Sequence, residues 1–236
     1  MNSSVYLSDV GFGNTSENAE ETRSADGMIE FRKKPLYDVV KRLFDFFASL
    51  VALIILSPLF IIVSIVVAVS DGKGKPFFVQ KRCGKNGKIF NVYKFRTMCV
   101  DAEAKKASLE ALNEMDGPVF KIQDDPRITK VGKVLRATNI DELPQLLNIL
   151  KGDMSFVGPR PPLPNEVAQY TPVDRQRLLV VPGLTCYWQV SLNRNDISFK
   201  EWMAMDRQYI LDRSALLDLK LIFKTAYVVI RHHDGR

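Results

Sequence analysis

The sequence has few of the side chains on which many enzymes depend, with two histidines and three cysteines among 236 residues. Both histidines, His232 and His233, lie near the C-terminal end, so the body of the chain has none to act as a catalytic base. The cysteines include no C-x-x-C pair. These absences argue against a Ser-His-Asp or Cys-His site, a structural zinc site and a disulfide framework. Any catalysis would then use carboxylates and cations.

The first 28 residues hold few large apolar side chains, and most of their charged groups are acidic. Such a segment buries too little apolar surface to offset the entropy of ordering, which predicts a disordered acidic tail over residues 1–28. The rest of the chain is therefore more basic than the formal net charge of +6 suggests. A basic body favours anionic partners, but charge alone does not separate nucleic acid, phospholipid and phosphorylated substrates.

Charge is absent from residues 46–69, where leucine, isoleucine, valine, phenylalanine and alanine dominate. This run of about 24 residues exceeds the roughly 20 that span a bilayer. A simple membrane-spanning anchor is the plainest interpretation. However, Ser57-Pro58 stands in the middle of the run. Proline lacks a backbone donor and clashes with the preceding turn, so we expect the helix to kink or break there.

The charges on either side of this run favour a hairpin. Lysines and arginines cluster both before and after it, and the positive-inside rule draws both flanks to the cytoplasm. We therefore predict a re-entrant, helix-break-helix membrane hairpin, preceded by a basic juxtamembrane segment, over residues 29–72. The Ser57 hydroxyl could bond a backbone group that Pro58 leaves free.

The remaining residues, 73–236, predict one compact α/β catalytic domain at the membrane surface. Alternating apolar residues at 77–79 and 89–95 predict two strands around a turn at residues 84–87. Helical patterns predict helices over 100–114, 129–136, 143–150, 198–211 and 215–229. The last of these mixes lysines with apolar residues, which suits an interfacial amphipathic helix as well as a core helix.

Asp141-Glu142 is the acidic pair with the clearest potential for chemistry. Pro144 fits only the first turn of a helix, which places the helix start close to Asp141. Plain N-capping is the ordinary role of an acid at such a place, and residues 138–141 weakly match a capping box. Several bases in the surrounding sequence favour more than a cap, because guanidinium groups bind phosphate oxygens through paired hydrogen bonds. They include Lys94, Arg96, Arg127, Lys130, Lys133, Arg136 and Arg160.

These motifs together resemble the monotopic phosphoglycosyl transferases, bacterial sugar transferases that act in exopolysaccharide, capsule and glycoconjugate synthesis. The resemblance runs from about Leu36 to Arg231 and includes the Leu217-Asp218-Leu219-Lys220 segment. The blocks that carry it are KRLFD (41–45), SP (57–58), VYKFRTM (92–98), DELPQ (141–145), KGDMSFVGPRP (151–161) and PGLT (182–185).

The resemblance implies a reaction as well as a fold. It implies transfer of a sugar phosphate from a UDP-sugar to undecaprenyl phosphate, with release of UMP and a phospho-sugar bound covalently to an aspartate. It assigns Asp141 as nucleophile, Glu142 as its partner, and both carboxylates as ligands of Mg²⁺. Phosphate or nucleotide contacts are carried over to Lys94, Arg136, Arg160 and Arg194. Asp218 is carried over as a weaker substrate-binding candidate, with a structural role equally open.

The resemblance also implies a place in the cell and a set of partners. We expect a monotopic protein of the bacterial inner membrane, in contact with phospholipid, with its active site facing the cytoplasm and no nucleic-acid partner. The sequence does not fix the oligomeric state, and a homodimer stays open. The block at residues 116–121 favours UDP-glucose or UDP-galactose as donor. Two alternatives remain, a membrane-anchored inverting glycosyltransferase that releases UDP and a non-catalytic membrane scaffold.

Overall fold

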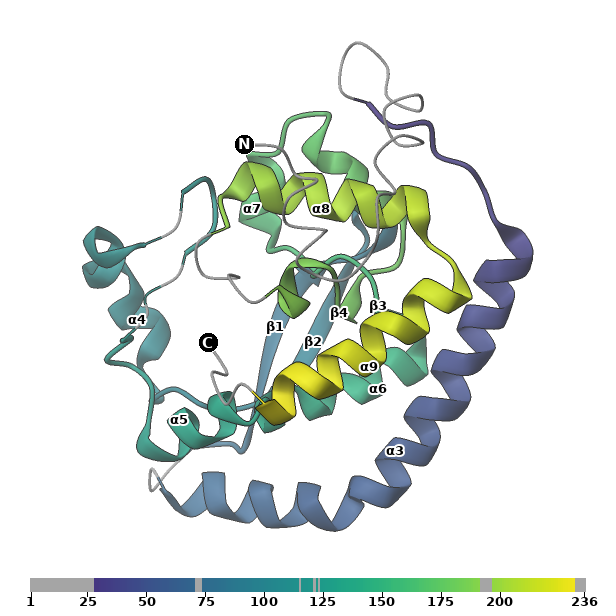
Figure 1. Ribbon diagram of the computed structural model, residues 1–236. Coiled ribbons are helices and arrows are strands. Elements are labelled where there is room, and N and C mark those ends of the chain that lie inside the picture. The colour runs from purple at the N-terminus through teal and green to yellow at the C-terminus, as the bar shows by residue number, and fades with distance from the viewer. Residues whose placement is uncertain are drawn as a thin grey trace.

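The protein combines one long apolar helix with a mixed body of short helices and two small sheets (Figure 1). The computed structural model describes residues 28–70, 74–114, 116–120, 122, 124–191 and 197–231. Apart from Met28, the predicted acidic tail lies outside these residues. The α-helices are α3 (Pro35–Ser70), α4 (Ala102–Lys106), α5 (Lys130–Ala137), α6 (Leu146–Lys151), α7 (Pro164–Ala168), α8 (Phe199–Asp212) and α9 (Ala215–Arg231).

The strands are β1 (Phe77–Cys83), β2 (Ile89–Phe95), β3 (Ser155–Val157) and β4 (Gly183–Thr185). Short 3₁₀ helices connect them, namely η1 (Lys85–Gly87), η2 (Ala107–Leu112), η3 (Ile140–Gln145), η4 (Asp174–Leu179) and η5 (Trp188–Val190).

Helix α3 joins the basic segment and the apolar run into one continuous helix. The break expected at Ser57-Pro58 is therefore a bend within a helix that continues through Pro58, and Figure 1 shows α3 curving around one side of the body. The Ser57 hydroxyl donates to the Ile54 carbonyl oxygen at 2.8 Å. That oxygen is the one whose usual donor, the amide of residue 58, proline lacks. The helix can thus bend without leaving this acceptor unbonded.

The surface of α3 that faces away from the body is apolar. Of the most apolar stretch of α3, 11% is buried within the protein. A core helix of a soluble protein would be mostly buried. Val51, Ile55 and Ile62 are more than half exposed. The helix therefore presents a long surface that lipid could cover.

Both halves of α3 contact the same body. In the first half, the Arg42 guanidinium donates to the carbonyl oxygens of Ile149 and Leu150 at the end of α6, each at 2.8 Å. In the second half, Val63 and Val67 pack in one cluster with Phe95 of β2 and Leu135 of α5. The two halves of α3 are thereby held against one structure.

The hairpin β1–β2 forms as predicted, with Phe77 opposite Phe95 and Cys83 opposite Ile89. Its turn contains Asn86 and Gly87 with φ of 57° and 77°, a left-handed region that asparagine and glycine tolerate.

The parallel pair β3–β4 was not predicted, since each strand has only three residues. The pair is possible because Gly158 and Gly183 lack side chains, and a Cβ on Gly183 would lie 2.0 Å from the Gly158 amide nitrogen. The main core lies beside this pair and includes Val157, Tyr209 and Leu221 from β3, α8 and α9. The turn after β3 is therefore anchored in the core.

The predicted helices are found with changes of length and type. The helix expected over 100–114 is α4 followed by η2, and the helix expected from Leu143 is η3 followed by α6. Helices α5, α8 and α9 lie close to their predicted ranges. Leu216, Leu219 and Phe223 of α9 are exposed while Leu217 and Leu221 are buried. Helix α9 thus has an exposed apolar face and a core face, and its contact with the membrane stays a prediction, as does the division of the chain at residue 72.

Candidate active site

Asp141 and Glu142 lie in the first turn of η3, close to the helix start that Pro144 predicted. The residue before η3, Asn139, has a left-handed φ of 55° and serves as the N-cap. Thr138 bonds backward to the Val134 and Leu135 carbonyl oxygens of α5, so the capping box expected from residues 138–141 does not form. Asp141 is 8% exposed. The carboxylate interacts with its own backbone amide, but burial of a charged group is costly, so capping alone does not account for its position.

Lys94 supplies the direct partner of the acidic pair. Its ammonium nitrogen, on β2, lies 2.6 Å from Glu142 Oε1, and it also attracts the Asp141 carboxylate. Contacts between β2 and η3 hold the two elements together. The structure therefore brings three of the predicted site residues into one cluster.

Arg136 lies on the Asp141 side of this cluster. It attracts the Asp141 carboxylate, and its Nε donates to Thr97 Oγ1 at 3.0 Å. Among the described residues, its two terminal nitrogens bond no acceptor. Gly132, one turn earlier on α5, allows this approach, because a Cβ there would lie 2.0 Å from the Thr97 carbonyl oxygen. Arg136 thus has unused donors beside a buried carboxylate.

Arg160 lies on the Glu142 side, in the turn that follows β3. Its positive charge acts on Glu142, and its guanidinium carbon lies 5.9 Å from the centre of the Trp202 ring. No described side-chain or backbone acceptor is bonded to this guanidinium. The acidic pair thus has two arginines nearby, Arg136 and Arg160, whose N–H groups could bind phosphate oxygens.

Arg82 is a member of this site that the sequence reasoning missed. It is 7% exposed on β1, acts electrostatically on both Arg160 and Glu142, and donates to the Pro161 carbonyl oxygen at 3.0 Å. Burial lowers its pKa to about 10, and the neighbouring Arg160 charge acts in the same direction. In the sequence, Arg82 stands close to several lysines, and nothing in this local pattern predicts that it is buried.

The two carboxyl groups have different pKa shifts. Burial raises the pKa of Asp141 to about 6, against the attraction of Lys94, and the neighbouring Glu142 charge adds to the rise. Glu142 is also desolvated, but the contact with Lys94 and the nearby Arg160 and Arg82 charges outweigh this and lower its pKa. At neutral pH both groups are mostly ionised, so neither needs a base to remove a proton.

Three other predicted residues are not part of this cluster. Asp218 accepts hydrogen bonds from Tyr37 at 2.8 Å and Tyr209 at 2.9 Å, and forms an ion pair with Lys41 at 2.5 Å. It shares none of these partners with Asp141 or Glu142. Ser57 and Pro58 lie within α3. Arg194 lies outside the described residues.

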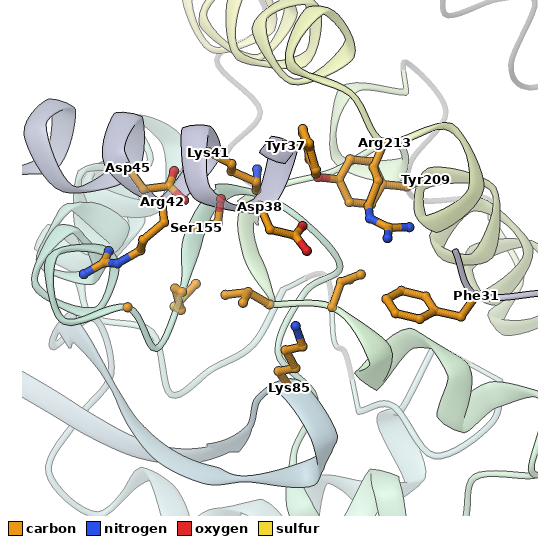
Figure 2. Close-up of a pocket in the computed structure, with 14 residues that line it drawn as sticks. Phe31, Tyr37, Asp38, Lys41, Arg42, Asp45, Lys85, Ser155, Tyr209 and Arg213 are labelled. Carbon is orange, nitrogen blue, oxygen red and sulfur yellow. The ribbon is translucent and has the colours of Figure 1, made fainter. Parts of the chain in front are cut away.

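A separate cavity of about 90 Å³ lies where α3 meets the body (Figure 2). Tyr37, Lys41 and Tyr209 line one side of it, and Lys85 points into it from the opposite side. Its lining includes neither carboxylate of the acidic pair nor Lys94, Arg136 or Arg160. The cavity is therefore distinct from the cluster around Asp141.

The donor set fits a magnesium ion held jointly with a substrate. Magnesium usually binds one or two carboxylates and completes its shell with water and substrate phosphates. Asp141 and Glu142 supply two such carboxylates. Among the described residues there is no group of three His, Cys, Asp or Glu side chains that could form a metal cage, so a site here would depend on the substrate for further ligands.

Comparison with known proteins gives consistent results. A family model described as bacterial sugar transferase matches residues 36–232. Galactosyl transferase CpsE of Streptococcus agalactiae is 40% identical over 96% of this chain, which spans 51% of that relative. Exopolysaccharide production protein ExoY of Sinorhizobium fredii is 44% identical over 81% of this chain and 86% of its own length. Undecaprenyl-phosphate galactose phosphotransferase of Salmonella typhimurium is 41% identical over 83% of this chain and 41% of its own length.

Proposed function

The chain belongs to the bacterial sugar transferase family, and from this premise we propose that it transfers a sugar 1-phosphate from a UDP-sugar to undecaprenyl phosphate, releasing UMP. The observation that carries the proposal is the buried Asp141 carboxylate beside the Lys94–Glu142 ion pair, with two nearby arginines that keep N–H donors without an acceptor among the described residues. A reaction between anions requires such an arrangement, because positive charge must offset the repulsion of carboxylate and phosphate.

In the first step, an Asp141 carboxylate oxygen attacks the sugar-bound phosphorus of the donor. A bond forms between this oxygen and phosphorus while the bond to the bridging oxygen breaks, and UMP leaves with that oxygen. The product is an acyl phosphate that carries the sugar. Arg136 and Arg160 would bind the phosphate oxygens, while Lys94 holds Glu142 ionised beside the nucleophile.

In the second step, an oxygen of undecaprenyl phosphate attacks the phosphorus of the acyl phosphate. The bond from phosphorus to Asp141 breaks, which restores the carboxylate and gives an undecaprenyl diphosphate sugar. The acceptor is already an anion at neutral pH and needs no general base. The lack of histidine within the body of the chain is therefore compatible with both steps.

Asp141 and Glu142 would hold the magnesium ion that this chemistry uses, which supplies positive charge to the phosphate oxygens when bound. The protein's own contribution is to keep both carboxylates ionised and to exclude water around Asp141, which is 8% exposed.

We place this reaction at the cytoplasmic face of the inner membrane. The bent α3 with its apolar outer surface, its basic flanks and its contacts to one body at both ends supports a re-entrant helix that enters and leaves by the same face. Phospholipid would cover that surface, and the exposed apolar face of α9 would rest at the interface. The active site would then meet a soluble donor and a membrane-bound acceptor together.

We propose UDP-galactose or UDP-glucose as the donor, for a first membrane step of polysaccharide or glycoconjugate synthesis. The names of CpsE and of the Salmonella relative both refer to galactose. The resemblance of residues 116–121 to transferases of neutral hexoses agrees with this choice.

The decisive test is mass spectrometry of the intact protein incubated with UDP-galactose or UDP-glucose and no lipid acceptor. We expect an increase by one hexose phosphate and release of UMP, both abolished by Asp141→Asn and by chelation of magnesium. Release of UDP with no adduct would instead indicate an inverting glycosyltransferase. Absence of any product after undecaprenyl phosphate is added would favour a non-catalytic scaffold.

A further inference from the structure

The turn that carries Arg160 is held by its backbone carbonyl groups. Residues 159–162 include three prolines, which have no amide hydrogen to donate. All four carbonyl oxygens nevertheless accept a hydrogen bond from another part of the chain. The donors are Gly183 N to Pro159 at 2.9 Å, Arg177 Nη2 to Arg160 at 3.0 Å, Arg82 Nη1 to Pro161 at 3.0 Å and Cys83 N to Pro162 at 2.8 Å.

Arg177 is the donor that bonds Arg160 itself. It is 3% exposed, and its Nη2 also lies 2.8 Å from Asp206 Oδ2 on α8, which is 1% exposed. Its Nη1 donates to the Tyr170 hydroxyl at 2.8 Å. Burying this ion pair is expensive in free energy. A pair that only stabilised the core could be replaced by apolar residues, so its contact with an active-site segment calls for a second role.

Trp202 provides a second link between this pair and Arg160. Asp206 and Trp202 are four residues apart on α8 and therefore lie on the same face of the helix. The Trp202 ring centre is 5.1 Å from the Arg177 guanidinium carbon and 5.9 Å from that of Arg160. One face of α8 thus contacts both Arg177, which donates to the Arg160 backbone carbonyl group, and the Arg160 side chain.

We propose that Arg177 and Asp206 are positioning residues for the transfer reaction, which act by holding Arg160 at the acidic pair. Asp206 orients the Arg177 guanidinium, Arg177 holds the Arg160 carbonyl group, and Trp202 supports the Arg160 side chain. Neither Arg177 nor Asp206 has a described contact with Asp141 or Glu142. The inference rests on the proposed function, in which Arg160 binds a phosphate group.

The test is a double-mutant cycle on the full-length protein, with UMP release from UDP-galactose and from UDP-glucose measured in parallel. We expect Arg160→Ala to lower kcat/KM by about 100-fold, as removal of an oriented donor typically does. Arg177→Met should lower it about tenfold alone, but less than about twofold when Arg160 is already alanine, because residues that act through one another are not additive. Equal losses in both backgrounds would overturn the inference.

Two further variants separate positioning from charge and from folding. Arg177→Lys keeps a positive charge opposite Asp206 but lacks the guanidinium fork, so we expect a loss close to that of Arg177→Met; wild-type activity would contradict the carbonyl contact. Asp206→Asn preserves the shape of the side chain. We expect it to lower activity in the wild-type background but not in Arg160→Ala. It provides a second cycle if Arg177→Met does not fold.

Arg213→Met is the matched control. Arg213 is also 3% exposed and bonds backbone carbonyl groups, those of Ile210 and Arg32. We expect Arg213→Met to reduce activity by the same factor in the wild-type and Arg160→Ala backgrounds, because it changes only the stability of the fold. If Arg160→Ala and Asp141→Asn both leave UMP release unchanged, the proposed function itself fails. If Asp141→Asn abolishes UMP release, Arg160→Ala lowers it and no coupling with Arg177 is found, only the positioning role fails.

Discussion

The Ser57 hydroxyl oxygen lies 2.8 Å from the Ile54 carbonyl oxygen and takes the place of the amide donor that Pro58 lacks. Within α3 this bond allows a bend without an unsatisfied backbone group. In a hydrocarbon environment an unbonded carbonyl group would be costly. The two adjacent residues therefore act together, one removing a helical hydrogen bond and the other replacing it.

Pro58→Ala should straighten α3 and change its topology. With an amide restored at position 58, the helix is long enough to cross the bilayer, so the two flanks should move to opposite faces. Labelling of single cysteines at Lys33 and Lys75, both exposed in the structure, should change from one face to both.

Ser49→Ala provides the control for this experiment. The Ser49 hydroxyl bonds the Phe46 carbonyl oxygen in the same manner, but no proline removes the backbone donor there. Its replacement should leave both cysteines labelled from the cytoplasmic side. Labelling of wild-type positions 33 and 75 from opposite faces would contradict the re-entrant helix.

Asp141→Asn should abolish turnover and stabilise the protein. Because burial raises the folded-state pKa of Asp141 to about 6, the folded protein holds a proton between about pH 4 and pH 6 that the unfolded chain releases. The free energy of unfolding therefore falls as the pH rises through this window, and the full destabilisation by the ionised Asp141 is present above it. At pH 7.5, in EDTA, the variant should gain about 1–3 kcal/mol in the free energy of unfolding. Thermal unfolding in nanodiscs measures this gain, which should vanish near pH 4.

Lys94→Met should shift the pH dependence of the reaction. Lys94 is the strongest of the attractions that lower the Asp141 pKa, so its loss raises the pH at which the nucleophile ionises. The acidic limb of the kcat/KM profile should move up by about one pH unit. Lys151→Met is the control, because Lys151 is exposed and bonds the Tyr93 hydroxyl. An unshifted limb in Lys94→Met would mean that this limb does not report Asp141.

Asp218→Asn distinguishes a structural from a catalytic role for Asp218. Its carboxylate joins Tyr37 and Lys41 of α3 to Tyr209 of α8. The variant leaves the Lys41 ammonium, whose side chain is 14% exposed, without this counter-ion, so we expect a loss of about 3 kcal/mol in the free energy of unfolding. The kcat/KM of the folded fraction should stay within about twofold. A loss of kcat/KM similar to that of Asp141→Asn would assign Asp218 to the reaction instead.

Local chemistry predicted the parts of the fold that depend on a few neighbouring residues. The predicted turn at residues 84–87 forms because Asn86 and Gly87 tolerate a left-handed backbone conformation. The helix predicted from residue 129 begins where the Thr129 side chain accepts a hydrogen bond from the Gly132 amide. The position of Asp141 at a helix start followed from Pro144 in the same way. The sequence therefore predicted that Asp141 and Glu142 lie together at the start of a helix.

Long-range contacts explain what could not be predicted. The pair β3–β4 depends on the approach of Gly158 to Gly183, which lie on segments distant in sequence. The burial of Arg82 and Arg177 depends on carbonyl groups of the turn after β3. None of these relationships leaves a periodic pattern in the chain.

The two hydrogen bonds from Arg42 to the end of α6 connect the apolar helix α3 to the helix that follows η3, which carries Asp141. If lipid covers α3 as we propose, a lateral force on this helix would reach the backbone next to the proposed reaction centre. Bilayer thickness and curvature then become variables of the chemistry, and a rate measured in a detergent micelle is a property of the protein together with that micelle.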